Sequence, residues 1–444
     1  MYLCSQGTIV ALATPPGVGA LAVLRVSGEK LAPLYRRLTR SVPKNRFALF
    51  CKLYHPTNGD VLDEVVATYF KSPNSFTGED MIEVSCHGGE AVQNNIISAL
   101  LDDNIRLANP GEFSFRAYMN GKMDLLQAEA VASLISSKSS YSNKIGLQHL
   151  EGKVSQRLSS IKLKATNLLA IIENELNFSD DEIDKTSIEN IEHRIKGLCN
   201  EIEKIVEASA FGRQIFSGVR VVFFGRPNSG KSSLFNTLVG YDRAIVSSTP
   251  GTTRDTVEAW IELKGIPVCL VDTAGVWESE EYLDALGVEK TRSEIERADL
   301  CLLIDENDPV DLKNENITSP VVLVRSKCDN QKPTTISNDI INVSSKKSQG
   351  IQELLTHIST FCSQSAGVSG GGSSVVMITR RQRGLLKKSH GILCEALEQS
   401  RENIGTDILS STLRQFVVCI QDVIGEIPNE NIMKTVFSTF CIGK

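Results

Sequence analysis

The sequence predicts a multidomain protein that combines α+β and α/β parts, and three observations lead to this prediction. The chain has 444 residues, which is too long for a single hydrophobic core, so two or three domains are expected. In its middle, three short apolar runs each end in a polar motif, which is typical of a parallel sheet. Upstream of them, apolar residues recur at intervals of 4, 3, 4 and 3, which predicts a helix with one buried face. These are Ile191, Ile195, Leu198, Ile202 and Ile205.

Composition narrows the class of protein. Hydrophobic residues make up 41% and charged residues 23%, and no apolar run approaches the ~18 residues of a transmembrane helix. The first twenty residues contain no Lys or Arg, so no signal peptide is expected. The eleven cysteines contain no Cys-x-x-Cys pair and are interpreted as reduced thiols of a cytoplasmic protein. With a net charge of −6, any contact with nucleic acid needs a local basic patch or a partner.

The first apolar run, 219–224, leads into the stretch GRPNSGKS, residues 225–232. This pattern predicts a phosphate-binding loop between a buried strand and a helix. Its glycines let backbone N–H groups point at phosphates, at the positive end of the helix that follows. Lys231 is expected to reach the β- and γ-phosphates and to serve catalysis, and Ser232 is expected to coordinate Mg²⁺.

Three further motifs follow in order, each at a strand end. Asp272 and Gly275 of DTAG match a Mg²⁺ contact through water and a γ-phosphate contact. In the stretch SKCD, Lys327 would pack the loop, and the Asp329 carboxylate would accept the N1 and N2 hydrogens of guanine. The stretch Ser344-Ser345-Lys346 is expected to line the side of the site that holds the guanine base. Together the motifs predict a guanine-nucleotide domain, although Ser326 stands where asparagine is usual and makes fewer hydrogen bonds to the base.

The residues at the expected catalytic positions differ from those of Ras-like GTPases. Val276 occupies the position of the water-orienting glutamine and cannot perform that task. The stretch SSTPGTTRD, 247–255, is rich in side-chain oxygens. Thr253 is the expected second Mg²⁺ ligand, and the remaining oxygens suit a monovalent cation beside the phosphates.

Five stretches outside the strand-end motifs carry a family resemblance. They are TPPGVGALAVLRVSG (14–28), SFTGEDMIEVSCHGG (75–89), GEFSFRAYMNGKMDLLQAEAV (111–131), PGTTRD (250–255) and the terminal FCIGK. In this order, and over its full length, the chain resembles the MnmE (TrmE) family of tRNA-modification GTPases. The resemblance implies an N-terminal α+β domain for tetrahydrofolate binding and dimerisation at 1–118. It also implies a helical domain in two parts, 119–215 and 362–444, with a Ras-like P-loop GTPase domain, 216–361, inserted between them.

The motifs and the resemblance together predict the nucleotide site. The residues predicted to bind GTP are Asn228, Ser229, Gly230, Lys231, Ser232, Ser233, Ser247, Ser248, Thr249, Pro250, Gly251, Thr252, Thr253, Asp272, Thr273, Ala274, Gly275, Ser326, Lys327, Asp329, Ser344, Ser345 and Lys346. The resemblance implies K⁺ ligands at Asn228, Ser247, Thr249 and Thr252, where the ion would act electrostatically like an arginine finger. The family's water-orienting glutamate falls at Asp284, which is one methylene shorter, and Glu280 and Glu281 are the second choices.

The resemblance also implies a folate site. By matching motif, its contacts are Arg25, Glu79, Lys122 and the terminal Lys444, for 5,10-methylene- or 5-formyl-tetrahydrofolate. Cations suit the folate carboxylates, and a glutamate suits the amino donors of the ring. The alternative from the residues alone is a structural salt bridge between Arg25 and Glu79.

The tail Cys441-Ile442-Gly443-Lys444 allows two interpretations beyond a simple chain end. As a prenylation signal it fits poorly, because Gly443 is not aliphatic and Lys444 is not a usual last residue. The resemblance implies instead that Cys441 lies beside the one-carbon unit, where a thiol can act as nucleophile or as general acid–base.

The function implied by the resemblance is K⁺-stimulated GTP hydrolysis in tRNA modification. A homodimer would join an FAD-dependent MnmG-like subunit in a heterotetramer and add a (carboxymethyl)aminomethyl group to C5 of wobble uridine 34. Two alternatives come from other classes. One is a ribosome-assembly GTPase without RNA-modifying chemistry, and the other is a lipid-anchored signalling GTPase.

Overall fold

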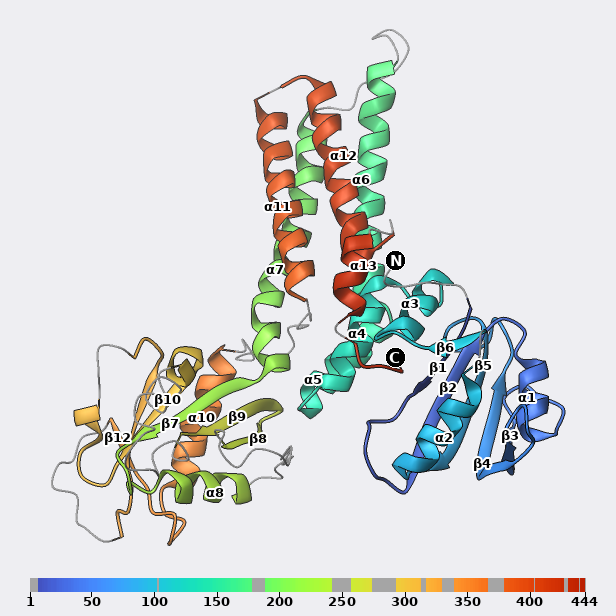
Figure 1. Ribbon diagram of the computed structural model, residues 1–444. Coiled ribbons are helices and arrows are strands. Elements are labelled where there is room, and N and C mark those ends of the chain that lie inside the picture. The colour runs from blue at the N-terminus through green and yellow to red at the C-terminus, as the bar shows by residue number, and fades with distance from the viewer. Residues whose placement is uncertain are drawn as a thin grey trace. The chain divides into compact units, whose positions relative to one another are not determined.

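The computed structural model describes residues 7–101, 104–177, 188–241, 257–273, 293–312, 317–329, 339–365, 379–402, 404–426, 430–438 and 440–443. The chain divides into two compact units (Figure 1). The first comprises Met1–Ala132, His149–Arg194 and Glu395–Lys444, and the second comprises Ser133–Gln148 and Ile195–Cys394. Helices α4 (Leu125–Ser136), α5 (Ser140–Leu150), α7 (Ile188–Ser217) and α11 (Arg380–Arg401) contain residues of both units.

The first unit is built on a six-stranded sheet with the order β3-β4-β5-β2-β1-β6. Neighbouring strands are antiparallel, except that β1 and β6 are parallel. The strands are β1 (Thr8–Leu12), β2 (Leu21–Gly28), β3 (Ala48–Tyr54), β4 (Val61–Phe70), β5 (Asp80–His87) and β6 (Ile105–Leu107). Alternation of buried and exposed residues along β4 marks a sheet with one face packed against a core.

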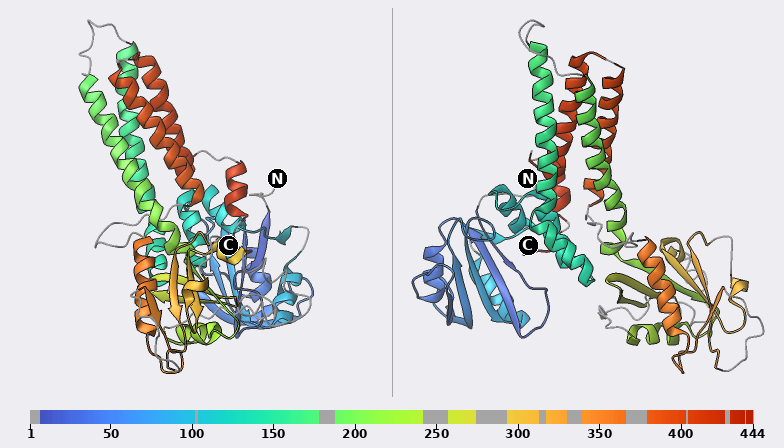
Figure 2. Two further views of the ribbon diagram at one scale, coloured as in Figure 1. Left: turned by 90° about the vertical axis from the view of Figure 1, so that its left-hand side faces the viewer. Right: turned by 180° about the vertical axis from the view of Figure 1, so that it is seen from behind.

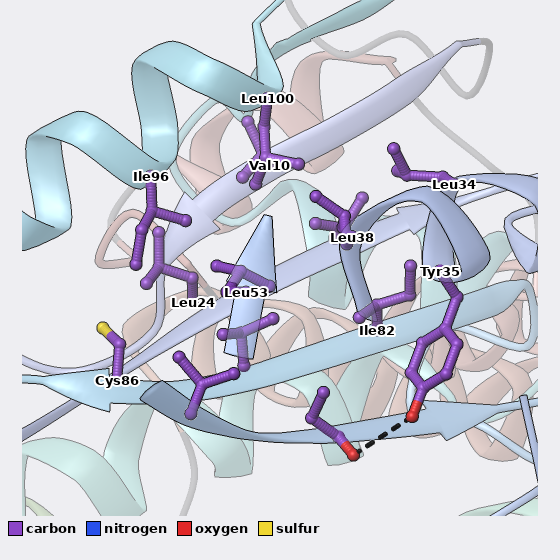
Figure 3. Close-up of a cluster of buried hydrophobic side chains, with 14 of the residues drawn as sticks. Val10, Leu24, Leu34, Tyr35, Leu38, Leu53, Ile82, Cys86, Ile96 and Leu100 are labelled. Atoms are coloured by element: carbon purple, nitrogen blue, oxygen red, sulfur yellow. Dashed lines mark hydrogen bonds between the residues drawn. The ribbon is translucent and has the colours of Figure 1, made fainter. Parts of the chain in front are cut away.

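Helices α1 (Ala32–Thr39) and α2 (Glu90–Leu100) cover the core face of this sheet. Figure 3 shows Leu34, Leu38 and Ile96 reaching from these helices toward Leu24 and Ile82 of the strands. Removing such side chains from water stabilises the fold by about 1.5–3 kcal/mol each. This layer therefore holds the strands that carry the N-terminal site residues.

Four further helices of the first unit matter for function: α3 (Glu112–Met119), α6 (Lys153–Asn177), α12 (Thr406–Ile424) and α13 (Glu430–Phe437). α6 and α12 run side by side (Figures 1 and 2). α13 packs on α3 and α4 through a cluster that includes Phe115, Phe437 and Phe440. Gly111 begins α3 with φ +72°, and a Cβ there would lie 2.4 Å from the Phe437 carbonyl oxygen, so only glycine fits.

The second unit contains a six-stranded sheet with the order β12-β11-β10-β7-β9-β8, parallel except for the β8–β9 pair. Its strands are β7 (Val219–Gly225), β8 (Val257–Leu263), β9 (Ile266–Asp272), β10 (Leu300–Asp305), β11 (Val321–Arg325) and β12 (Ile340–Asn342). Helices of this part include α8 (Lys231–Tyr241), the short η2 (Pro309–Leu312) and α10 (Ile351–Ser365). Every residue of β9 and β10 is buried, as the sequence of a central parallel strand requires.

The observed elements confirm the predicted fold class, multidomain α+β and α/β. The strand predicted over 219–224 is β7, and the helix predicted from the apolar spacing is α7. All five residues of its predicted face are buried: Ile191, Ile195, Leu198, Ile202 and Ile205. The domain boundaries at 118, 215 and 361 remain predictions. No helix within the described residues is long and apolar enough for a membrane span.

Candidate nucleotide and ligand sites

The predicted phosphate loop joins β7 to α8 in a tight turn. Asn228 and Gly230 both adopt left-handed backbone conformations, with φ values of +62° and +87°. A Cβ on Gly225 would lie 2.0 Å from the carbonyl oxygen of Ile304 in the adjacent β10, so this position accepts only glycine. The loop thus ends a central strand and leads directly into a helix N-terminus, which is the geometry that binds anions.

The Lys231 side chain lies inside this loop. Lys231 is only 4% exposed, and its Nζ donates to the carbonyls of Gly225 at 3.0 Å and Arg226 at 2.8 Å. Burial lowers the pKa of Lys231, and the nearby Asp272 carboxylate opposes that shift. A buried cation beside a glycine-rich turn is the arrangement that attracts phosphate.

Two residues of the DTAG motif are placed beside the loop. Asp272 ends β9 and pairs in register with Phe223 of β7. The Thr273 hydroxyl donates to the Phe223 carbonyl at 2.7 Å, and both polar residues are nearly fully buried. Asp272 is therefore held close to Lys231, where a carboxylate can serve a phosphate-bound Mg²⁺.

A cavity of about 380 Å³ joins the phosphate loop to the predicted base side. The Ser344 hydroxyl donates to Asp329 Oδ1 at 2.7 Å, and this bond is the main reason that the pKa of Asp329 is lowered. The Lys327 ammonium pairs with Glu306 at 2.7 Å. The residues that line the cavity are Gly230, Ser233, Thr237, Ser326, Lys327, Asp329, Ser345 and Lys346. Thr237, on α8, was not predicted, because it lies outside the motif that ends at 232.

Ser326 connects the two halves of this site. Its hydroxyl donates to the Ser229 carbonyl of the phosphate loop at 2.5 Å, and its N–H donates to Asp305 at 2.9 Å. The residue is 4% exposed, so the bond to Ser229 is shielded from water. The Ser326 hydroxyl therefore holds the phosphate loop and the SKCD loop together.

Several predicted site residues lie outside the described part of the chain. They are Ser247, Ser248, Thr249, Pro250, Gly251, Thr252, Thr253, Ala274, Gly275, Val276, Glu280, Glu281, Asp284 and Lys444. Their predicted roles in K⁺ and Mg²⁺ binding, in orienting water and in folate binding remain predictions.

The predicted folate residues of the first unit lie in a cluster of charges, but their pairing differs from the alternative drawn from sequence. Arg25 Nη2 pairs with Glu83 Oε1 at 2.7 Å, whereas Glu79 Oε2 pairs with Arg116 Nη1 at 3.0 Å. The expected Arg25–Glu79 salt bridge is therefore wrong. Arg25 pairs with Glu83 because the register of β2 and β5 puts these two residues directly opposite each other.

Aromatic rings and the C-terminal tail complete the surroundings of Arg25. Its guanidinium lies 5.3 Å from the ring centroid of Phe76 and 5.8 Å from that of Phe113. Arg25 Nη1 also donates to the Gly443 carbonyl at 3.5 Å. Gly443 has φ +90°, and a Cβ there would lie 2.2 Å from the Leu12 carbonyl oxygen, so the tail fits closely against the end of β1.

Lys122 and Cys441 are both exposed within this unit. A Cβ on Gly78, the neighbour of Glu79, would lie 3.2 Å from Lys122 Cγ, so this lysine extends beside the Glu79 loop. Sequence reasoning missed Glu83, Glu112 and Arg116. The signal was available, since Glu112 and Arg116 are opposite charges spaced i, i+4 and lie within one of the stretches that carry the family resemblance.

The family model described as GTP-binding protein TrmE N-terminus matches residues 8–122, and the MnmE helical domain model matches residues 125–441. The tRNA modification GTPase MnmE of Koribacter versatilis (strain Ellin345) is 36% identical over 98% of this chain and 99% of its own length. The protein of the same name from Aquifex aeolicus (strain VF5) is 35% identical over the same shares. The crystal structure of the G domain of the T. maritima FeoB iron transporter covers 32% of this chain and 98% of its own, with 26% identity and a TM-score of 0.26.

The glycine-rich loop after a central parallel strand, with a carboxylate-lined cavity beside it, defines a P-loop GTPase. More specifically, the chain belongs to the MnmE family of tRNA modification GTPases, as its sequence motifs predicted. This membership speaks against the ribosome-assembly alternative.

Proposed function

We propose that this GTPase helps to modify C5 of wobble uridine 34 in certain tRNAs, adding a (carboxymethyl)aminomethyl group. It would act as a homodimer that joins an FAD-dependent MnmG-like subunit in a heterotetramer. The carbon would come from 5,10-methylene-tetrahydrofolate or a 5-formyl relative bound by Arg25, Glu79, Lys122 and Lys444. The observation that carries this proposal is the docked tail, in which Arg25 bonds the Gly443 carbonyl two residues beyond Cys441.

The N-terminal cluster suits a folate chemically. Folates combine a flat ring that carries N–H donors with carboxylates on a flexible arm. A carboxylate at Glu79 accepts from the ring, the rings of Phe76 and Phe113 offer flat apolar surface, and the exposed Lys122 suits an anionic arm. Cys441, exposed on the tail, supplies a thiol that serves as nucleophile or as general acid–base in the one-carbon transfer.

In the GTPase part, Lys231 would neutralise the β- and γ-phosphates, and Ser232 and Thr253 would hold Mg²⁺. Asn228 with Ser247, Thr249 and Thr252 would hold K⁺, which supplies positive charge where none comes from an arginine finger. Asp284 would orient the attacking water.

Nucleoside analysis of tRNA tests the modification chemistry. Cells that lack this protein should lose the modified wobble uridine, and wild-type protein should restore it. Cys441→Ser keeps the side-chain size but replaces the thiol by a much weaker acid and nucleophile, so it should restore GTP hydrolysis without restoring the modification. Full modification by Cys441→Ser would show that the thiol is structural.

The cation proposal has its own test. GTP hydrolysis should be faster in K⁺ than in Na⁺ at matched ionic strength, because loss of one comparable electrostatic stabiliser costs roughly 10²–10³ in rate. Equal rates in the two salts would contradict it. Asp284→Asn should slow hydrolysis with little effect on GTP affinity, with Glu280→Gln and Glu281→Gln as comparisons.

A further inference from the structure

A continuous line of charges runs through the N-terminal domain and ends at Glu79. Arg106 Nη2 lies 2.6 Å from Glu112 Oε1, which lies 3.0 Å from Arg116 Nη2, and Arg116 Nη1 lies 3.0 Å from Glu79 Oε2. The side chains are 39%, 0%, 1% and 15% exposed in that order. The two central members are thus removed from water, while both ends reach the surface.

The buried centre of this line is ionised. Burial raises the pKa of Glu112, but hydrogen bonds from Arg106, the Asn109 backbone N–H and Arg116 outweigh it and leave the pKa below its usual value. Arg116 is permanently charged. It is also fixed in direction, because Glu112 sits one turn earlier on α3 and holds Nη2 while Nη1 faces Glu79.

The two oxygens of Glu79 are used unequally. Oε2 accepts from Arg116 at 3.0 Å and from the Ser27 hydroxyl at 2.8 Å, and Ser27 is itself held by Thr77 at 2.7 Å. The contact between Glu79 Oε1 and Arg116 Nη1 is longer, 3.3 Å. The carboxylate is therefore anchored mainly through one oxygen, which leaves the other better placed to accept from a ligand.

We propose that Arg116, aligned by Glu112, is the positioning residue of this site. It sets the orientation of Glu79 so that Oε1 accepts hydrogen bonds from a ligand edge with two adjacent N–H donors, such as the 2-amino-4-oxopyrimidine edge of a pterin. This inference rests on the proposed role of Glu79 in folate binding. Arg116 itself does not contact the ligand, and no other part of the proposed chemistry depends on it.

The test compares two ligands on the full-length protein: 5-formyl-tetrahydrofolate and its analogue that lacks the 2-amino group. Wild type should prefer the 2-amino compound by roughly tenfold or more, because the analogue lacks one of the two N–H donors that the fixed carboxylate accepts. Arg116→Lys keeps the charge but cannot span both carboxylates as a guanidinium fork does, so most of this preference should disappear. Glu112→Gln, a smaller change, should reduce the preference partly.

Arg40→Lys is the matched control. It makes the same chemical change in the same domain, at a guanidinium that stacks on Tyr54 and has no contact with the charge line. Arg40→Lys should keep the wild-type ligand preference. GTP hydrolysis should stay at the wild-type rate in all three variants, which reports that the GTPase part is intact. Unchanged binding of the analogue without the 2-amino group reports that the N-terminal site is intact.

The outcomes separate the two proposals. If wild type binds neither compound, the proposed folate function is wrong, and the role of Arg116 fails with it. If wild type shows the preference and both Arg116→Lys and Glu112→Gln keep it, or weaken both ligands equally, Arg116 is only a structural residue and the inference is wrong. Selective loss of the 2-amino preference in the two variants supports it.

Discussion

Two carboxylates in this chain are proposed to accept paired N–H donors from a ring, and their surroundings differ. Asp329, partly exposed at the edge of the nucleotide cavity, is held by the Ser344 hydroxyl at 2.7 Å. Glu79, with a side chain 15% exposed, is held by the buried Arg116, which in turn needs the buried Glu112. Water stabilises the first anion, so one hydroxyl suffices to orient it. The second anion is largely removed from water and is held by a full positive charge, and that buried charge is paired with another negative one.

The two sites therefore differ in whether the residues that orient the carboxylate also stabilise the fold. A change near Asp329 should affect ligand affinity and leave the fold intact. A change near Glu79 should affect the fold as well, because each buried charge left without its partner is destabilising.

The largest expected effect is on stability, from Arg116→Met. Removing the cation leaves Glu79 without its charge partner and the fully buried Glu112 with Arg106 as its one remaining cation of the line. It should destabilise the N-terminal domain by about 3–5 kcal/mol. Hydrogen exchange of the backbone amides in 105–119 measures this loss without depending on the rest of the chain. Asp329→Asn is the comparison, and its exchange in the same segment should be unchanged. A loss below ~1 kcal/mol for Arg116→Met would break the distinction between the sites.

The next effect is on affinity, from Asp329→Asn. An amide presents a donor where guanine also presents donors, so GTP affinity should fall roughly 10–100-fold, the value of one or two charge-assisted hydrogen bonds. Equilibrium binding of a fluorescent GTP analogue measures it, with far-UV circular dichroism to confirm an unchanged fold. Wild-type affinity in this variant would mean that Asp329 does not contact the base.

The smallest effect is expected from Ser344→Ala, and it depends on pH. The Ser344 hydroxyl is the main cause of the lowered pKa of Asp329, so its removal returns that pKa toward its ordinary value. The ionised carboxylate is the form that binds, so affinity is present above the pKa and is lost as the pH falls through it. In Ser344→Ala that loss should begin at a higher pH than in wild type, with an affinity near neutral pH only a few-fold lower. The GTP affinity of both proteins is measured at a series of pH values, from pH 7 down to the pH at which the protein begins to unfold. Ser348→Ala, a substitution at an exposed serine nearby, is the control. Superimposable pH profiles would show that the hydroxyl does not tune the carboxylate.

Much of the GTPase part could be predicted because its signals are local. The apolar run 219–224, the glycines around Lys231 and the four polar motifs each report on a few consecutive residues. In a parallel sheet the carboxyl ends of neighbouring strands meet at one edge, so local motifs at strand ends come together without further information. Thr237 was missed because a residue two turns into the helix has no motif of its own.

The sequence alone determined the fold class, the family, the nucleotide motifs and the buried face of α7, since each depends on spacing along the chain. Only the tertiary structure decided which charges pair in the N-terminal domain. Arg25 meets Glu83 because β2 and β5 align in antiparallel register, and Glu79, one residue before β5 begins, is left for Arg116 of α3. These partners are 58 and 37 residues apart, and a shift of one residue in the strand pairing would turn Arg25 away from Glu83. The same holds for the tail, whose glycine reaches Arg25 across 418 residues because α13 packs on α3 and α4 and directs the chain end to β1.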